Sequence, residues 1–468
     1  MWFRLLILPT LAVPAVFAFA DGGSSATARP AFLVAAFALL GIAAAATNGP
    51  LIPASREGRA ALSALAALAT LTAASRAWSP DPGGWLVATQ LASGYFALLW
   101  AASIQLVANR PSRALVEPAL AAGTLVVVAY GLVTRALSDW FPVEQIARAG
   151  GRLTAPTGYW NAQALLAALG IVLCASIATG RSSPRGLRAA ATAAAPVLGA
   201  GLMLTYSRTG IAAALAGMIL LGITGGSSAA SVRRLVPIVA AALAGVALTL
   251  PFAGVRDGPT AAADGGLWLS LLVIAACAAG SAGAAIRPRP LTGRSRALHR
   301  ILVAGLVVTL ALPFAAALID RTDDGRESFG ATSGRLASTG SNRAQYWHVA
   351  VEAFAQRPAA GHGAGSFASL WLRERTIDEK VINAHSLWLE TAAELGLAGL
   401  ALVLAFAVGV ALALRRGGQA LHGASAALLA WLVGASLDWH WQIPAVTANA
   451  VIMAALAISA ERPSASAD

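Results

Sequence analysis

The sequence predicts an all-α polytopic membrane protein with about 12–14 transmembrane helices and one long extracytoplasmic loop. Hydrophobic residues make up 57% of the 468 residues, and charged residues make up 12%. The mean hydropathy is +0.69, whereas soluble domains are about 25% charged. A globule in water cannot bury so much apolar surface, because even a large domain leaves about a quarter of its chain surface exposed. The composition therefore excludes a soluble enzyme, a disordered chain, a nucleic-acid-binding protein and a disulfide-stapled secreted domain.

Apolar runs long enough to cross a bilayer, which takes about 20 residues, occur along most of the chain. The predicted spans are 3–20, 30–48, 60–76, 84–108, 116–138, 160–180, 187–205, 209–225, 234–252, 265–285, 299–320, 385–414, 420–437 and 443–461. The alanine-rich run 60–76 is among the weakest on insertion scales. The first run, with Arg4 before an apolar stretch ending at Ala20, also fits a cleavable signal peptide, and this alternative stays open.

The distribution of arginine predicts the orientation. With a cytosolic N-terminus, eighteen arginines lie in inner segments and seven in the short outer segments, as the positive-inside rule requires. The net charge is +12. In this orientation most of the arginines that produce it lie in cytosolic loops, where they meet anionic lipid. The sequence divides into N-terminal transmembrane helices 1–320, an extracytoplasmic loop 321–384 with an interfacial helix, C-terminal transmembrane helices 385–461 and a cytosolic tail 462–468.

Ionisable residues at the membrane edge are costly, so they are candidates for function. The first candidate is the short outer turn Tyr206-Ser207-Arg208-Thr209-Gly210. Its alternative interpretation is an arginine that snorkels to the lipid head groups.

The second candidate begins at Arg343 in the long loop. Trp347, Val351 and Phe354 follow at helical spacing and form one apolar face. A glycine-rich stretch, Pro358-Ala359-Ala360-Gly361-His362-Gly363-Ala364-Gly365-Ser366-Phe367, comes next and predicts a tight turn with close backbone approach. The alternative interpretation is an interfacial amphipathic helix whose arginine meets lipid phosphate. A dinucleotide-binding fingerprint is excluded, because no strand precedes the glycines.

The third candidate is His385, which precedes Glu390 and Glu394 where the chain re-enters the bilayer. The two glutamates are four residues apart and share one helix face. The alternative interpretation is a buried polar network that holds helices together. A metal site is not predicted, since the sequence has no HExxH spacing and Cys174 and Cys277 both lie in apolar runs. Asp323-Asp324 is interpreted as a solvated turn.

These motifs, in this order, resemble the O-antigen ligase and polymerase superfamily over roughly residues 150–445. Gly158-Tyr159-Trp160-Asn161 and Asp438-Trp439-His440-Trp441 resemble further outer segments of that family. Two positions depart from the family pattern: Ser386 replaces a common asparagine, and His362 replaces a small or apolar residue. The other matching residues are Ser207, Arg208 and Gly210; Arg343 and Trp347; Pro358, Gly361, Gly363, Gly365 and Phe367; His385, Leu389, Glu390, Glu394, Leu395 and Gly396.

The resemblance implies a GT-C-like, metal-independent glycosyltransferase without a cofactor in the inner (cytoplasmic) membrane, with its active site on the extracytoplasmic face. It implies transfer of a glycan from a polyprenyl-pyrophosphate carrier to a glycan, lipid or protein acceptor. Arg208 and Arg343 would hold the pyrophosphate, because guanidinium groups bind phosphate oxygens in pairs. His385, with a pKa near the unperturbed value of about 6.5, would either accept the proton of the acceptor hydroxyl or position the acceptor. The residues expected to bind substrate are Tyr206, Ser207, Asn161, Arg152, Gly363, Gly365, Glu390, Glu394 and Asp438.

Two other classes of function stay open. A transporter or flippase for lipid-linked glycans also needs a cationic cavity, and a non-catalytic component of a surface-polysaccharide assembly needs no reaction at all. A transporter predicts basic residues at the membrane midplane, whereas the arginines here lie at the ends of the predicted spans. This distribution favours the enzyme.

Overall fold

The computed structural model describes residues 6–144, 146–180, 182–224, 229–257, 265–283 and 342–460. These residues form helices joined by loops and contain no strand. The first group of helices is α2 (Ile7–Ala18), α3 (Ala28–Ala46), α4 (Arg56–Ala74), α5 (Gly84–Ala108), α6 (Arg113–Ala136), α7 (Trp160–Thr179), α8 (Arg185–Leu204) and α9 (Arg208–Thr224). The second group is α10 (Ala229–Thr249), α11 (Ala253–Arg256), α12 (Gly266–Gly283), α15 (Arg343–Gln356), α16 (Phe367–Glu374), α17 (Leu387–Gly417), α18 (His422–Leu437) and α19 (Pro444–Ile458).

The prediction of a polytopic helical membrane protein is confirmed. Within the described residues, seven helical segments are long and apolar enough to cross a membrane, and the last of them contains both α17 and α18. Shorter apolar helices, such as α2 and α19, stand beside them. A helix occupies each predicted span except 299–320, which lies outside the described residues.

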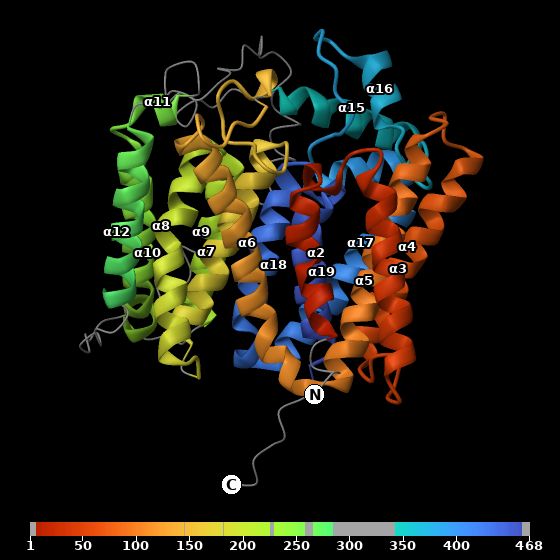
Figure 1. Cartoon of the computed structure of the whole chain (residues 1–468). Helices are drawn as coiled ribbons and strands as arrows, with labels where there is room; N and C mark the ends of the chain where they lie inside the picture. The colour runs from red at the N-terminus through yellow and green to blue at the C-terminus, as the bar shows by residue number, and fades with distance from the viewer. Residues whose placement is uncertain are drawn as a thin grey trace.

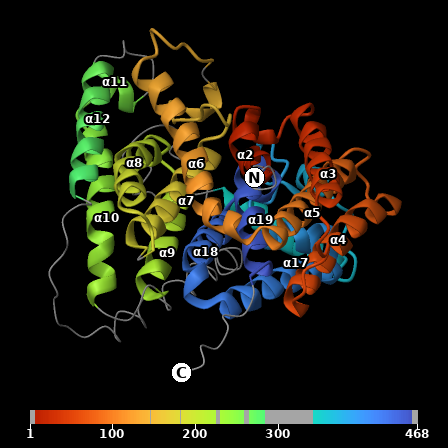
Figure 2. The ribbon, with the colours of Figure 1, turned by 60° about the horizontal axis from the view of Figure 1, so that its bottom comes forward.

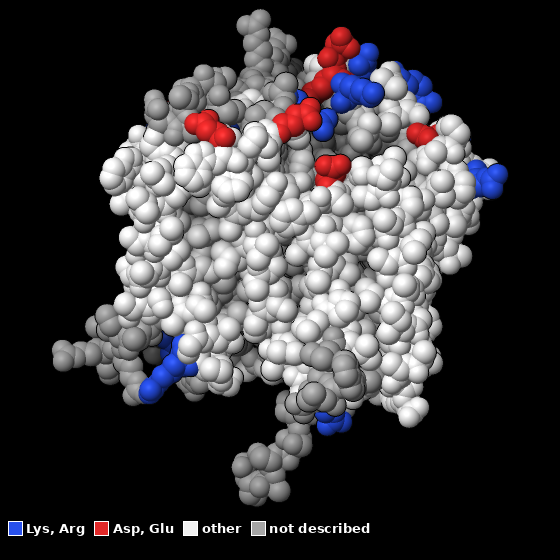
Figure 3. Space-filling view, viewed as in Figure 1, with Lys and Arg blue, Asp and Glu red and all other residues white. Residues whose placement is uncertain are grey.

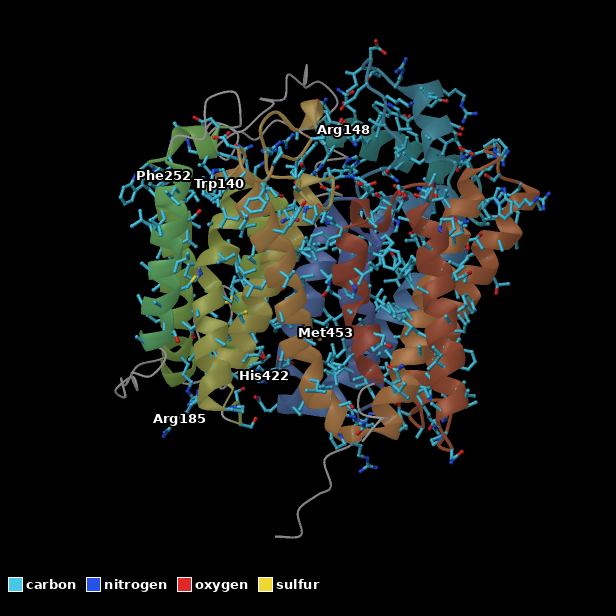
Figure 4. The ribbon with its side chains drawn as sticks, viewed as in Figure 1. Trp140, Arg148, Arg185, Phe252, His422 and Met453 are labelled. Carbon is cyan, nitrogen blue, oxygen red and sulfur yellow. The ribbon has the colours of Figure 1, made fainter. Side chains whose placement is uncertain are left out.

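On the face in view, charged side chains gather at the two ends of the bundle, and the belt between them is uncharged (Figure 3). One end, which we call the loop face, carries α11, α15 and α16 (Figure 1). Trp140, Arg148 and Phe252 lie at this end, Arg185 and His422 lie at the opposite end, and Met453 lies between them (Figure 4). Described residues of the predicted outer segments therefore share one face, as the arginine pattern requires.

The helices form two groups on either side of α18 and α19 (Figure 2). Helices α6 to α12 lie on one side, and α3, α4, α5 and α17 lie on the other. Small residues permit close approach among α6 to α12: a Cβ built on Gly199 of α8 would lie 2.1 Å from the Ala242 carbonyl oxygen of α10. In lipid, such backbone contact replaces the hydrophobic drive that packs helices in water.

Helix α17 is broken at Gly396, whose φ of +61° is left-handed. The glycine-rich loop fills the break with four backbone hydrogen bonds. The amides of His362 and Gly363 donate to the carbonyls of Ala393 and Glu394, at 3.0 and 2.7 Å. The amides of Leu397 and Ala398 donate to the carbonyls of Pro358 and Ala359, at 2.8 and 3.2 Å. This exchange is needed because unpaired backbone groups at membrane depth are costly.

Candidate active site

Asp438 is the centre of a polar cluster on the loop face. It follows the last residue of α18 in an extended conformation, and its side chain is fully buried. Its carboxylate accepts hydrogen bonds from Asn161 Nδ2 at 2.6 Å, Arg343 Nη2 at 2.7 Å and the Tyr159 hydroxyl at 2.9 Å. The Trp439 amide donates a further bond at 2.8 Å. A buried carboxylate requires such partners, since an unpaired one is strongly destabilising.

The charges around Asp438 keep it ionised. Burial alone would raise the pKa of Asp438, but Arg343, His440 and His385 together hold that pKa below its ordinary value. The pKa of Tyr159 moves the other way, because burial and the charge of Asp438 both raise it. Tyr159 therefore remains a protonated donor to an ionised acceptor.

Arg343 joins α15 to α9. It is the first residue of α15, and its side chain is 22% exposed. Besides its ion pair with Asp438, it donates from Nη1 to the Thr209 hydroxyl at 3.2 Å. Thr209 follows Arg208, the first residue of α9. The starts of the two arginine-bearing helices therefore lie together, although Thr209 and Arg343 are 134 residues apart in the sequence. Closeness of the two guanidinium groups themselves stays a prediction.

His385 lies two residues before α17 with its ring beside the same carboxylate. Its Nε2 is 3.9 Å from Asp438 Oδ1, and its side chain is 20% exposed. Its Nδ1 is 3.0 Å from the carbonyl oxygen of Asn383. A carbonyl only accepts, so Nδ1 carries the hydrogen in the neutral ring and Nε2 carries the lone pair. The atom that can take a proton therefore faces Asp438.

The electrostatic surroundings of His385 correct one expectation from the sequence. Burial lowers the pKa of His385, and Arg343 lowers it further, while Asp438 offsets only part of the shift. These surroundings shift the pKa of His385 down from the unperturbed value expected from the sequence. The residue is neutral over a wider pH range than a free histidine.

Asn161 and Ser207 connect the cluster to the start of α9. The Ser207 hydroxyl donates to Asn161 Oδ1 at 2.7 Å and accepts from the Gly210 amide at 3.1 Å. Ser207 thus satisfies a free amide of the first turn of α9, as an N-cap residue does. Tyr206 precedes it, buried and with a left-handed φ of +49°. The turn before α9 is therefore stabilised by the bond from the Gly210 amide to Ser207 and by the bond from Ser207 to the side-chain amide of Asn161.

Arg152 reaches the cluster through aromatic rings. It is buried, its Nε donates to the Ala149 carbonyl at 2.8 Å, and its guanidinium carbon lies 3.7 Å from the centre of the Trp160 ring. The Trp160 ring is 4.8 Å from the Tyr159 ring. The Arg152 guanidinium therefore places a second positive charge next to the aromatic rings of Trp160 and Tyr159.

The two glutamates of α17 bind the protein's own backbone. Glu394 accepts from the amides of Gly365 and Phe367 at 2.8 and 3.0 Å. Glu390 accepts from the Ala384 amide at 2.6 Å and from the side chain of Gln442. Gly363 and Gly365 belong to the same loop, with φ of +97° and +72°. These contacts assign the four residues to holding the His385 segment in place, and a role in substrate binding stays a prediction.

Several members of the site were not predicted as site residues. Tyr159 and Thr209 lie inside motifs that the sequence singled out, so their position was a usable signal. The carbonyl of Asn383 is a backbone group and has no signal in the sequence. Within the part of the chain that the structure describes, no group of three His, Cys, Asp or Glu side chains is placed to hold a metal ion. Asp323-Asp324 lies outside that part.

Residues 265–404 match the family model described as O-antigen ligase. No curated protein matches the chain. The matched range contains Arg343, the glycine-rich loop, His385 and both glutamates, whereas Asn161, Arg208 and Asp438 lie outside it. The motif resemblance over roughly 150–445 is therefore wider than the matched range. The chain is therefore a polytopic helical membrane protein whose residues 265–404 match the O-antigen ligase family model.

Proposed function

We propose that this protein is a membrane glycosyltransferase that moves a glycan from a polyprenyl-pyrophosphate carrier to an acceptor hydroxyl. The proposal depends on one observation: the side chains of Arg343, Asp438 and His385 lie close together beside the start of α9. Arg343 lies 2.7 Å from Asp438, and His385 Nε2 lies 3.9 Å from the same carboxylate. A fixed cation and a proton acceptor are the two groups that this reaction needs. We further propose that the loop face is extracytoplasmic and that the membrane is the cytoplasmic membrane.

The proposed donor site lies between the starts of α9 and α15. Arg208 and Arg343 are the first residues of these helices. The partial positive charge of a helix N-terminus favours anions, and each guanidinium binds phosphate oxygens in pairs. Both effects strengthen as the leaving pyrophosphate gains negative charge. The arginines therefore stabilise the transition state more than the bound donor.

His385 acts as the general base in this proposal. Its Nε2 lone pair takes the proton of the acceptor hydroxyl while the acceptor oxygen forms a bond to the anomeric carbon. The bond between that carbon and the pyrophosphate oxygen breaks, and its electron pair leaves with the polyprenyl pyrophosphate. Asp438 stabilises the imidazolium that forms, because an ionised carboxylate beside it favours the charged ring. The Asn383 carbonyl keeps the ring in the reactive tautomer throughout.

The test is transfer by the purified protein in liposomes with a polyprenyl-pyrophosphate-linked glycan. We expect two products in equal amounts, free polyprenyl pyrophosphate and a new glycoside. Arg343→Lys keeps the charge but loses the planar fork, so we expect transfer to fall by about 10²–10³-fold. Arg373→Lys is the matched control, because Arg373 pairs with Glu374 on the surface of α16. Movement of the intact donor across the bilayer without pyrophosphate release would instead identify a transporter.

A further inference from the structure

A separate cavity of about 360 Å³ lies beneath the loop face, among α4, α5, α17, α18 and α19. Its size is within the range of roughly 300–1,000 Å³ that is usual for ligand sites. Arg208, Arg343 and Asp438 do not line it; Asn383, Trp441 and Gln442, which flank the polar cluster, do. The cavity is therefore a neighbour of the candidate active site. It is distinct from the arginine side of that site, by which we mean Arg208, Arg343 and the starts of α9 and α15.

The cavity is apolar within the membrane and polar only at the loop face. Its deeper wall is made of Leu65, Leu68, Leu91, Val403, Phe406 and Leu428. The polar groups at its upper end have partners within the protein: Glu390 and Glu394 accept the bonds described above, and Asp81 accepts from the amides of Gly83 and Gly84 at 2.8 and 2.7 Å. Burial of apolar surface is thus the main contribution the cavity offers to a ligand.

Carboxyl groups outnumber basic side chains at the upper end of the cavity. Asp81, Glu390 and Glu394 line it together with Asn383. Arg29, the basic residue among the described lining residues, donates to the Ser24 carbonyl at 2.7 Å. A pyrophosphate placed here would meet three carboxyl groups and a single arginine, Arg29, whereas a head group without net negative charge would meet no such excess of acidic groups. This balance is opposite to that of the arginine side.

We propose that this cavity binds the hydrocarbon chain of a membrane lipid whose head group carries no net negative charge. The chain lies along α4, α5 and the broken helix α17, and the head group lies beside Asn383. Because the Asn383 carbonyl holds the His385 ring, the bound head group is a direct neighbour of the proposed base. The site is a lipid-binding site in its own right and does not depend on the proposed transfer reaction.

The test uses the full-length wild-type protein in liposomes and a phosphatidylethanolamine with a diazirine in the middle of one acyl chain. After illumination, mass spectrometry maps the modified residues. We expect adducts on cavity residues such as Leu65, Leu91 and Val403, in addition to lipid-facing residues such as Leu86. Adducts confined to lipid-facing residues would overturn the proposal. A polyprenyl monophosphate probe is the second arm, and equal or stronger labelling of the cavity by this probe would overturn the assignment of the head group.

A pair of variants on α5 provides a second measurement. Ala88 lines the cavity, and Leu86, two residues earlier, is 46% exposed. Ala88→Trp fills the cavity, so we expect phosphatidylethanolamine labelling of Leu65 and Val403 to fall by about tenfold, as a loss of one decade in affinity gives. Leu86→Trp should leave this labelling unchanged. Undiminished labelling in Ala88→Trp would overturn the site, and the wild-type map decides alone if that variant does not fold.

Discussion

His385 has a backbone φ of +54°, a left-handed conformation that residues with a Cβ rarely adopt. The conformation costs about 1–2 kcal/mol, and such strain is kept mainly where function needs it. It points Nε2 at Asp438 while Nδ1 meets the Asn383 carbonyl. The strained backbone of His385 therefore coincides with a ring whose two nitrogen atoms both have a defined neighbour.

The first prediction concerns loss of this imidazole. His385→Ala removes the proposed base, so we expect transfer to fall by about 10²–10⁴-fold with donor binding retained. In the wild type, the neutral ring is the active form. Because the pKa of His385 is lowered, the rate should rise with pH through a midpoint below 6.5 and then stay level. Full activity in the variant, measured by product formation across pH, would remove the assignment of the base.

The second prediction separates the charge of Asp438 from its structural role. Asp438 raises the pKa of His385, and Arg343 lowers it. Asp438→Asn removes the first effect and keeps the second, so the acid limb of the pH–rate profile should move to still lower pH. Asp257→Asn is the matched control, because Asp257 pairs with Arg256 at an exposed position. An unchanged acid limb in Asp438→Asn would contradict the coupling, whatever the loss in rate.

At the scale of elements, α17 and the glycine-rich loop form one unit. A Cβ on Gly361 would lie 2.3 Å from the carbonyl carbon of Glu394, and one on Gly396 would lie 2.6 Å from the backbone of Ala359. Both glycines have left-handed φ values. The glycine spacing therefore reflects contact between two backbones, and Glu394 completes the contact by accepting two amides of the loop.

The third prediction tests this unit. Gly361→Ala combines a left-handed φ with a backbone clash, so we expect the free energy of unfolding to fall by at least about 1–2 kcal/mol. Gly41→Ala on α3 is the control, because a Cβ there meets no atom within 4 Å. In a helix, alanine is favoured over glycine by about 0.5–1 kcal/mol. Thermal unfolding in detergent should therefore show opposite shifts, and equal shifts would exclude the close backbone contact.

At the scale of the whole molecule, the N-terminal helices support the site. The turn between α4 and α5 binds the glycine-rich loop directly: the Ala364 amide donates to the Ser75 hydroxyl at 3.0 Å, and Trp78 Nε1 donates to the Ala360 carbonyl at 3.3 Å. Ser75 and Trp78 lie outside the range that matches the O-antigen ligase family. The glycine-rich loop, which lies inside the matched range, is thus held by the turn between α4 and α5, which lies outside it.

The fourth prediction concerns sidedness. In a variant with Cys174 and Cys277 replaced by alanine, single cysteines are placed at Asp378, which is 96% exposed on the loop face, and at Ser182 on the opposite face. The arginine bias predicts that an impermeant thiol reagent added to intact cells labels Asp378→Cys and spares Ser182→Cys. The reverse pattern would place the loop face in the cytosol and exclude the proposed reaction there.

The sequence by itself determined the class of fold, the described spans and the grouping of the loops on two faces. These features depend on local quantities, because the length of an apolar run and the position of arginines decide insertion one segment at a time. It also identified His385, Arg343 and Asp438 as candidates, because charged groups at the edge of a span need a reason to be there.

Only the tertiary structure decided what these residues do to one another. The pKa of His385 depends on burial and on Arg343 and Asp438, which come from different elements of the chain. Three of the hydrogen bonds to Glu390 and Glu394 come from backbone amides, which every residue except proline has, so no residue type in the sequence predicts them. The cavity beside Asn383 is lined by α4, α5 and the broken helix α17, and α4 packs against both of the others. Contacts between distant segments set all three, and the spacing of residues along one segment does not encode them.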